Sequence, residues 1–246
     1  MTKEFTPLNQ LFNSLLDEKD VQLWIKRDDL THPELQGNKW RKLKYNISEA
    51  SQTNKKYLLT FGGAFSNHIF ATAAAGKLFN LKTIGVIRGE QIIPLNSTLH
   101  FAKNCGMDLR FVELRLGNVC NVRCRTCNPA SSSKWLEDYK DIVEKADFIN
   151  KGYLGLNFPE DFKWAEDDNF YNDLFDSAPN LELLYINGGE PTLIKQHWAY
   201  LQKLVDSGRS KNVILWYNIN CTMLPPIALE LWPEFKEARI CLSIDD

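Results

Sequence analysis

Three cysteines lie close together in the sequence: Cys120, Cys124 and Cys127, with the spacing C-x3-C-x2-C. Thiolates at this spacing can bind one metal centre, which is a better explanation than the burial of three separate thiols. A tetrahedral zinc ion or a cubane iron–sulfur cluster usually takes four protein ligands, so the fourth ligand has to come from elsewhere. His197 or Cys221 could complete a zinc site, and the spacing alone leaves zinc open.

A second group of reactive side chains lies in the first half of the chain. Lys39 and Lys42 stand three positions apart at the start of a predicted helix, so they share one face of it. An adjacent cation favours the neutral form of a lysine amine, which can then attack a carbonyl group. The simpler alternative is a solvated basic helix face, and the spacing by itself favours that alternative.

Alternating strands and helices are predicted to hold both groups in place. Strand-like patterns occur at 21–26, 57–61, 83–87, 114–116, 181–186, 213–219 and 239–244. Helical spacing of apolar residues occurs at 8–17, 38–50, 66–79, 97–103, 131–145, 193–205 and 227–235. This alternation predicts an α/β fold with a parallel sheet.

The ends of the later predicted strands carry small and polar residues. The cysteines follow the strand at 114–116, Gly-Gly-Glu-Pro at 188–191 follows the strand at 181–186, and Ser-Ile-Asp at 243–245 ends the last strand. Because ligands gather beyond the carboxyl ends of parallel strands, these segments are candidates for ligand binding. An ordinary strand-to-helix turn and a polar chain end are the alternatives.

In this order, the three motifs resemble those of the radical S-adenosylmethionine (SAM) enzymes, more closely the twitch-type branch, over about residues 113–246. The resemblance implies that Cys120, Cys124 and Cys127 hold three irons of a [4Fe-4S] cluster, and that SAM binds the fourth iron. It also implies reductive cleavage of SAM to a 5′-deoxyadenosyl radical, with an electron donor such as a flavodoxin or ferredoxin as partner.

The same resemblance implies a set of cofactor-binding residues around the cluster. They are Gly188, Gly189, Glu190, Pro191, Ser243 and Asp245. The glycines would let the backbone approach the methionine part of SAM, and the glutamate would interact with its ammonium group. The last two residues would hydrogen-bond the ribose. The family's barrel has six strands and four are predicted here, so this half is expected to be a partial, four-stranded radical SAM barrel.

Three motifs of the first half resemble a different family. Lys-Arg-Asp-Asp-Leu at 26–30, Gly-Asn-Lys-Trp-Arg-Lys-Leu at 37–43 and Phe-Gly-Gly-Ala-Phe-Ser-Asn-His at 61–68 occur in order. They resemble the fold-type II pyridoxal-phosphate (PLP) enzymes, specifically the aminocyclopropanecarboxylate deaminase and D-cysteine desulfhydrase group. The resemblance covers about residues 7–112 and predicts a partial domain of that fold.

This second resemblance implies roles for three residues. Lys39 would form the Schiff base with PLP, and Asn67 would hydrogen-bond the phenolic oxygen of the cofactor. Ser66 would lie near the substrate carboxylate, at the first turn of a helix whose N–H groups favour anions. The alternative for Ser66 and Asn67 is helix capping, which the same residues would perform without any ligand.

The composition is that of an ordinary globular protein. The 246 residues are 44% hydrophobic and 24% charged, with a formal net charge of −2, so no basic surface points to nucleic acid. The N-terminus has no apolar signal-peptide region, and no run of about eighteen apolar residues predicts a membrane span. Clustered cysteines without a secretory signal favour a reducing compartment, and we expect a cytoplasmic protein.

The two resemblances meet between residues 111 and 114, within one strand-like run. Domain boundaries usually fall in exposed linkers, so two incomplete segments, 1–113 and 114–246, are predicted to form a chimera. The main interpretation is a radical SAM iron–sulfur protein whose radical has an unidentified substrate. The alternatives are PLP-dependent deaminase or D-cysteine desulfhydrase-like activity through Lys39, and a non-catalytic fragment that binds metal.

Overall fold

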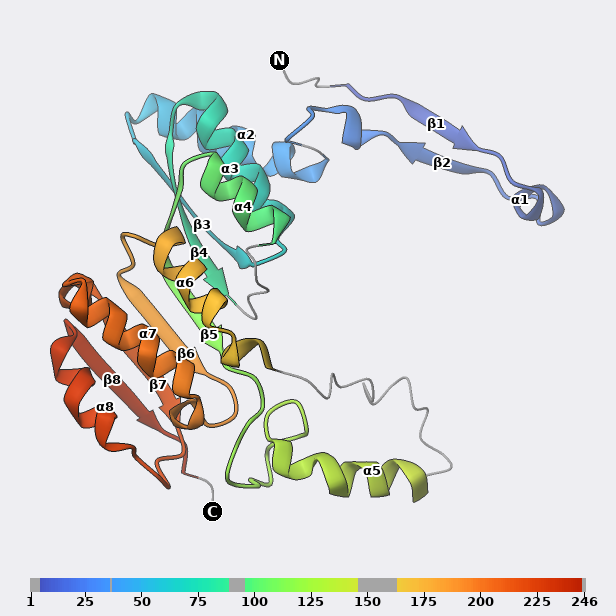
Figure 1. Ribbon diagram of the computed structural model, residues 1–246. Helices are drawn as coiled ribbons and strands as arrows, with labels where there is room; N and C mark the ends of the chain where they lie inside the picture. The colour runs from blue at the N-terminus through green and yellow to red at the C-terminus, as the bar shows by residue number, and fades with distance from the viewer. Residues whose placement is uncertain (1–4, 36, 89–95, 146–162, 245–246) are drawn as a thin grey trace. The chain divides into compact units, whose positions relative to one another are not determined.

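Figure 1 presents the computed structural model, which describes residues 5–35, 37–88, 96–145 and 163–244. The chain divides into two compact units. Unit 1 comprises Met1–Gly85 and Ser97–Asp108, and unit 2 comprises Val86–Asn96 and Leu109–Asp246. The boundary predicted between residues 113 and 114 falls within strand β5 (Met107–Arg115), and it stays a prediction.

Unit 1 begins with an N-terminal arm, residues 5–26. Strand β1 (Leu8–Leu11) pairs antiparallel with β2 (Leu23–Lys26), and the short helix α1 (Ser14–Glu18) lies between them in the chain. The helix predicted for 8–17 is therefore wrong over its first half. The helix begins only at Ser14 because the side chain of Asn13 accepts a hydrogen bond from the backbone N–H of Leu15 at 2.9 Å and caps it.

The body of unit 1 alternates strands and helices, as the sequence predicts. After the turn η1 (Asp28–Leu30) come α2 (Asn38–Gln52), β3 (Tyr57–Gly63), α3 (Asn67–Phe79), β4 (Lys82–Arg88) and α4 (Ser97–Asn104). The core lies between α2 and α3, where Leu43 and Ile47 pack against Ala71, Ala74 and Ala75.

Helix α3 packs closely because its residues are small. A Cβ atom added at Gly76 would overlap the side chain of Thr83 and lie 2.8 Å from the carbonyl oxygen of Leu81. Only glycine allows this approach between α3 and the start of β4. The close packing holds the C-terminal half of α3 against the start of β4.

Unit 2 contains a parallel sheet in which β5, β6 (Leu183–Asn187), β7 (Ile214–Ile219) and β8 (Glu237–Leu242) are neighbours in that order. The predicted α/β fold with a parallel sheet is confirmed. The partial radical SAM barrel is not. Among the described strands β8 pairs only with β7, so the sheet stays open, whereas a barrel requires its last strand to close on its first.

The helices of unit 2 connect these strands (Figure 1). They are α5 (Leu136–Lys145), α6 (Asp168–Ser177), α7 (Lys195–Asp206) and α8 (Pro226–Leu231). Short helical turns are η2 (Ser133–Trp135), η3 (Lys163–Glu166), η4 (Pro191–Leu193), η5 (Arg209–Asn212) and η6 (Trp232–Glu234). Helix α7 contacts α6 and α8 and buries Trp198, Leu201 and Leu204.

Two features of the sequence lie outside the described residues. They are Asp245 and most of the irregular stretch at 147–168, of which only the part from residue 163 is described. Within the described parts of the chain, no helix is both long and apolar enough to cross a membrane.

Candidate functional sites

A cavity of about 550 Å³ lies in unit 1 and contains both the reactive lysine and the asparagine singled out in the sequence. The first residues of three helices line it: Gly37, Asn38 and Lys39 at α2, Asn67 at α3, and Ser97 and Thr98 at α4. The first N–H groups of a helix have no partner within the helix, and the helix dipole makes this end positive. Three such ends at one cavity favour a ligand with negatively charged groups.

Gly37 shapes the start of α2. It adopts φ +60° and ψ −138° at the N-cap position and provides no side-chain cap, which is a backbone conformation that favours glycine. Gly37 therefore has no side-chain oxygen that could accept hydrogen bonds from the first N–H groups of α2, as a serine cap would. Gly37, Asn38 and Lys39 line the cavity, so the N-terminal end of α2 lies at its wall.

The lysines of α2 face the beginning of α3. Burial lowers the pKa of His68 below its ordinary value, and the positive charges of Lys39 and Lys42 lower it further. The imidazole is therefore neutral at physiological pH. Its Nδ1 atom is buried, and none of the residues that the structure describes provides a hydrogen-bond partner for it. The positive charge beside the cavity therefore comes from the two lysines and not from His68.

Ser66 and Asn67 take different positions. The hydroxyl oxygen of Ser66 accepts hydrogen bonds from the backbone N–H groups of His68 and Ile69, at 3.1 and 3.4 Å. Ser66 is thus the N-cap of α3, as the simpler alternative predicted. Asn67 lines the cavity with Lys39. The structure brings Lys39 and Asn67 to one cavity and gives the Ser66 side chain a capping contact next to it.

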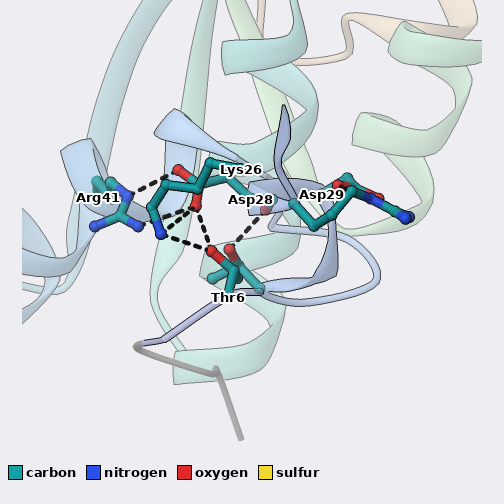
Figure 2. A network of polar contacts seen from close by, with 7 residues as sticks. Thr6, Lys26, Asp28, Asp29 and Arg41 are labelled. Atoms are coloured by element: carbon teal, nitrogen blue, oxygen red, sulfur yellow. Dashed lines mark hydrogen bonds and ion pairs between the residues drawn. The ribbon is translucent and has the colours of Figure 1, made fainter. Parts of the chain in front are cut away.

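A network of polar contacts holds the start of α2 in place (Figure 2). The Asp28 carboxylate accepts hydrogen bonds from the Arg41 guanidinium, both at 3.1 Å, and one from the Thr6 hydroxyl at 2.6 Å. Lys26 Nζ lies 3.3 Å from the same carboxylate. The hydrogen bonds from Arg41 and then Thr6 hold the pKa of Asp28 well below its usual range. Asp28 therefore stays ionised and ties the arm to the helix that carries Lys39.

A second cavity, of about 430 Å³, lies in unit 2 beyond the carboxyl ends of the parallel strands. Its walls include the predicted residues Cys120, Cys124, Cys127, Gly188, Gly189 and Ser243. These segments therefore meet at the carboxyl ends of the strands; a ligand bound by them stays a prediction. Cys120 is buried, and the other two cysteines are half-buried.

Gly188 and Gly189 are explained by contacts within the chain. Their φ angles are +89° and +53°. A Cβ atom on Gly188 would lie 2.9 Å from the carbonyl oxygen of Gly117, and one on Gly189 would overlap the carbonyl oxygen of Val119. The loop after β6 thus packs directly on the loop after β5, and glycine is needed whether or not a ligand binds.

Glu190 is buried, and both of its carboxylate oxygens are engaged. One accepts the Thr192 hydroxyl at 2.6 Å, and the other accepts the backbone N–H of Asn220 at 2.7 Å. Glu190 is the N-cap of η4, where Pro191 occupies the first position. The predicted contact with the SAM ammonium group would compete with these internal hydrogen bonds.

His197 and Cys221, which were considered as a fourth zinc ligand, have different environments. Burial lowers the pKa of His197 to about 4. Its Nδ1 donates to the carbonyl oxygen of Ile194 at 2.8 Å, so Nε2 accepts from the Tyr217 hydroxyl at 2.9 Å. Cys221 is exposed. His197 is therefore a core histidine whose ring nitrogens are both used.

Comparison with known proteins identifies relatives of the deaminase and desulfhydrase group. No protein-family model matches the chain. A proposed 1-aminocyclopropane-1-carboxylate deaminase from Pyrococcus abyssi is 35% identical over 108 residues, which are 44% of this chain and 32% of the relative. The mitochondrial bifunctional D-cysteine desulfhydrase/1-aminocyclopropane-1-carboxylate deaminase of Arabidopsis thaliana is 43% identical over 73 residues, 30% of this chain and 18% of the relative.

The crystal structure of a homologue of the deaminase is 29% identical and covers 58% of this chain and 38% of that chain, with a TM-score of 0.40. This TM-score is too low for the superposition to support a common fold, so the likeness rests on sequence identity. The N-terminal region resembles the deaminase and desulfhydrase group of fold-type II PLP enzymes. The chain spans about a third of the length of the first curated relative.

These findings overturn the main interpretation of the sequence. The relatives belong to the deaminase and desulfhydrase group, and they support the alternative reading. Within the described residues, no three Cys, His, Asp or Glu side chains are grouped so that they could hold a metal ion. The predicted radical SAM activity, [4Fe-4S] cluster and SAM are therefore wrong. The electron donor was implied by that chemistry alone. The cytoplasmic location and the absence of nucleic-acid partners stay predictions.

Sequence reasoning missed part of the unit 1 cavity. Asp29, Glu34, Ser97 and Thr98 also line it and were not among the candidate residues. The helix at 97–103 was predicted, and it follows a strand in the same alternating pattern as α3. Because helices that follow parallel strands begin at the same edge of a sheet, this pattern could have indicated that α4 begins beside α3.

Proposed function

We propose that unit 1 binds PLP and an amino-acid substrate in the manner of the deaminase and desulfhydrase group, with Lys39 as the reactive amine. About two thirds of the first relative lies outside the match. We therefore assign the activity of the full-length relatives to this chain only within this proposal. The candidate substrates are those in the relatives' names, 1-aminocyclopropane-1-carboxylate and D-cysteine.

One observation supports the proposal most strongly: Lys39 and Asn67 line the same cavity, although they lie on different helices. The cavity, at about 550 Å³, is within the range of small-molecule and cofactor sites. Its donor set is an amine, a side-chain amide and helix N-termini, which suits a ligand with an aldehyde, a phenolic oxygen and anionic groups. The residues present fit PLP in these respects.

The side chains can be assigned separate tasks. The Lys39 amine would take up the cofactor's aldehyde, and the Asn67 amide would donate a hydrogen bond to the phenolic oxygen. The N-terminal ends of α2 and α4, which line the cavity, would bind and orient the carboxylate of the amino acid. His68 is neutral because burial and the two lysines lower its pKa, so it does not place a further positive charge beside the Lys39 amine. When bound, PLP supplies the electron sink for bond cleavage at the substrate's α-carbon.

The test is a titration of the purified chain with PLP, followed by its visible absorption spectrum. The wild-type protein and the variants Lys39→Ala and Lys44→Ala are compared. Lys44 is a matched control, because it lies on the same helix but is not part of the cavity and sits over the ring of Tyr45. Wild type and Lys44→Ala are expected to change the spectrum of the cofactor, and Lys39→Ala is expected not to.

Turnover is measured separately, as ammonia release from 1-aminocyclopropane-1-carboxylate and as sulfide release from D-cysteine. An equal spectral change in Lys39→Ala and wild type would contradict the proposed role of Lys39. Cofactor uptake through Lys39 without turnover of either compound would contradict the activity but not the binding site.

A further inference from the structure

Two of the three clustered cysteines in unit 2, Cys124 and Cys127, lie at the ends of one tight turn. The backbone N–H of Cys127 donates to the carbonyl oxygen of Cys124 at 3.1 Å, and Arg125 and Thr126 form the turn between them. The Cα atoms at the ends of such a turn lie within about 7 Å of each other, and disulfides join Cα atoms about 4.4–6.8 Å apart. The turn therefore brings the two thiols into the range in which they can form a disulfide.

The loop that carries this turn is fixed by contacts on both sides. The indole N–H of Trp135 donates to the carbonyl oxygen of Cys124 at 3.0 Å. The Ser132 hydroxyl donates to the carbonyl oxygen of Val122 at 2.7 Å. The Arg123 guanidinium lies over the Trp135 ring, 5.2 Å from its centroid. Because these contacts hold the turn in place, a bridge between its ends needs little movement of the backbone.

A small molecule in the unit 2 cavity would lie beside both cysteines. Cys124 and Cys127 are half-buried and line this cavity of about 430 Å³, which is within the range of small-molecule sites. The exposed side chain of Arg115 lines it too and donates to the Ser131 hydroxyl at 3.3 Å. A guanidinium at this place favours a molecule that carries carboxylate groups.

The acidic residue in the cavity wall has partners of its own. The Glu113 carboxylate accepts a hydrogen bond from the Asn187 side chain at 2.9 Å and lies 3.5 Å from the Arg88 guanidinium. These contacts offset its negative charge, so Glu113 opposes the binding of a carboxylate less than an unpaired glutamate would.

Cys120 lines the same cavity but lies outside the turn. It is buried, at 8% exposed, and its Sγ accepts a hydrogen bond from the Asn220 side-chain amide at 3.7 Å. The turn, which Cys120 does not share, singles out Cys124 and Cys127 as the pair.

We propose that Cys124 and Cys127 form a thiol–disulfide exchange site for a low-molecular-weight disulfide with carboxylate groups, the class to which glutathione disulfide belongs. One protein thiolate attacks the small disulfide, forms a mixed disulfide and displaces one small thiolate. The second protein thiolate then attacks the protein sulfur of the mixed disulfide and displaces the other small thiolate. The protein thiols are oxidised to one disulfide, the small disulfide is reduced to two thiols, and the two protons pass from the former to the latter.

The ring that this bridge closes contains few residues. A disulfide constrains the unfolded chain less when the loop that it closes is short. The bridge therefore adds little stability to the fold and is suited to reversible exchange.

The test maps disulfides in the full chain. The chain is reduced, separated from the reductant and incubated with glutathione disulfide at low ionic strength; the remaining thiols are alkylated, and tryptic peptides are identified by mass spectrometry. Trypsin cleaves after Arg123, Arg125 and Lys134, so the bridge joins peptide 124–125 to peptide 126–134. In wild type this linked pair is expected to exceed every other disulfide by at least about tenfold, because the turn gives the second thiol a high effective concentration. Dithiothreitol should reverse it.

Substitutions separate the parts of the proposal. Cys124→Ser and Cys127→Ser should each lose the linked pair. Cys120→Ser and Cys221→Ser, which change a buried and an exposed cysteine outside the turn, should retain it. Arg115→Gln should slow the reaction with glutathione disulfide by about threefold or more and leave the reaction with the uncharged bis(hydroxyethyl) disulfide unchanged.

The wild-type map does not depend on how well the variants fold. Mixed disulfides spread over the exposed cysteines, a bridge that uses Cys120 as often, or equal formation of the 124–127 bridge in the urea-unfolded chain would overturn the exchange site. An unchanged rate for Arg115→Gln with glutathione disulfide would overturn the assignment of a substrate with carboxylate groups.

Discussion

Mild acid is expected to destabilise unit 2 through His197, whose imidazole is buried and neutral. Burial lowers its pKa to about 4 in the folded chain, whereas a histidine in an unfolded chain has a pKa of about 6.5. Between these two values the unfolded state binds more protons than the folded state. The free energy of unfolding is therefore greatest above pH 6.5 and falls as the pH drops through this window.

The size of the effect follows from the two pKa values. A difference of about 2.5 corresponds to about 3 kcal/mol by pH 4, since one unit is worth about 1.4 kcal/mol. At pH 5 the native imidazole is still neutral, and the expected loss is about 2 kcal/mol. For a unit of this size, that lowers Tm by roughly 4–8 °C.

Urea unfolding at pH 7 and pH 5, followed by tryptophan fluorescence, measures this loss. Trp198 lies against the His197 ring, with ring centroids 4.2 Å apart, so its emission reports on the surroundings of His197. The variant His197→Gln has no titrating group at this position and should lose about 2 kcal/mol less between the two pH values than wild type does.

A second measurement does not depend on how well the variant folds. The chain has four histidines, so the imidazole resonance of His197 can be assigned and followed with pH in the wild-type protein. A resonance that titrates near pH 6.5, or equal losses of stability in wild type and variant, would refute the reasoning.

Three further substitutions test separate contacts. Gly76→Ala should destabilise unit 1 by about 1–3 kcal/mol in urea unfolding, because the added methyl group would overlap the neighbouring strand β4; an unchanged midpoint would contradict this packing. Glu190→Ala should cost unit 2 about 1–3 kcal/mol, because it leaves the part-buried N–H of Asn220 without its acceptor; a neutral effect on Tm would mean that water replaces the carboxylate. Asp28→Asn should weaken the contact with Arg41 and increase the rate of tryptic cleavage in the arm; an unchanged rate would show that other contacts hold it.

The periodic elements were predictable because local spacing and burial agree. Helix α2 buries Leu43, Ile47 and Ala50, whose spacing of four and three places them on one face of a helix. The helix predicted at 8–17 was wrong over its first half for the opposite reason. Its apolar residues have helical spacing, yet they face solvent, so no core selects the helix, and pairing with β2 decides the structure instead.

The candidate sites were predicted less completely than the fold. The resemblance to the PLP enzymes implied that Lys39 and Asn67 contact one cofactor; both line one cavity, and their contact with PLP stays a prediction. Gly189 packs against Val119. The Glu190 carboxylate accepts a hydrogen bond from the backbone N–H of Asn220. Both contacts join residues far apart in the chain, so no local sequence pattern encodes them. Motifs that looked like ligand contacts therefore have internal partners, which spacing alone does not show.

Reductive trapping tests the central claim most directly. The full chain is incubated with PLP, treated with borohydride and digested, and the modified peptides are identified by mass spectrometry. The account predicts that the adduct lies on the peptide containing Lys39 and is lost in Lys39→Ala, while Lys44→Ala retains it. Labelling spread evenly over the surface lysines, with no preference for Lys39, would contradict it.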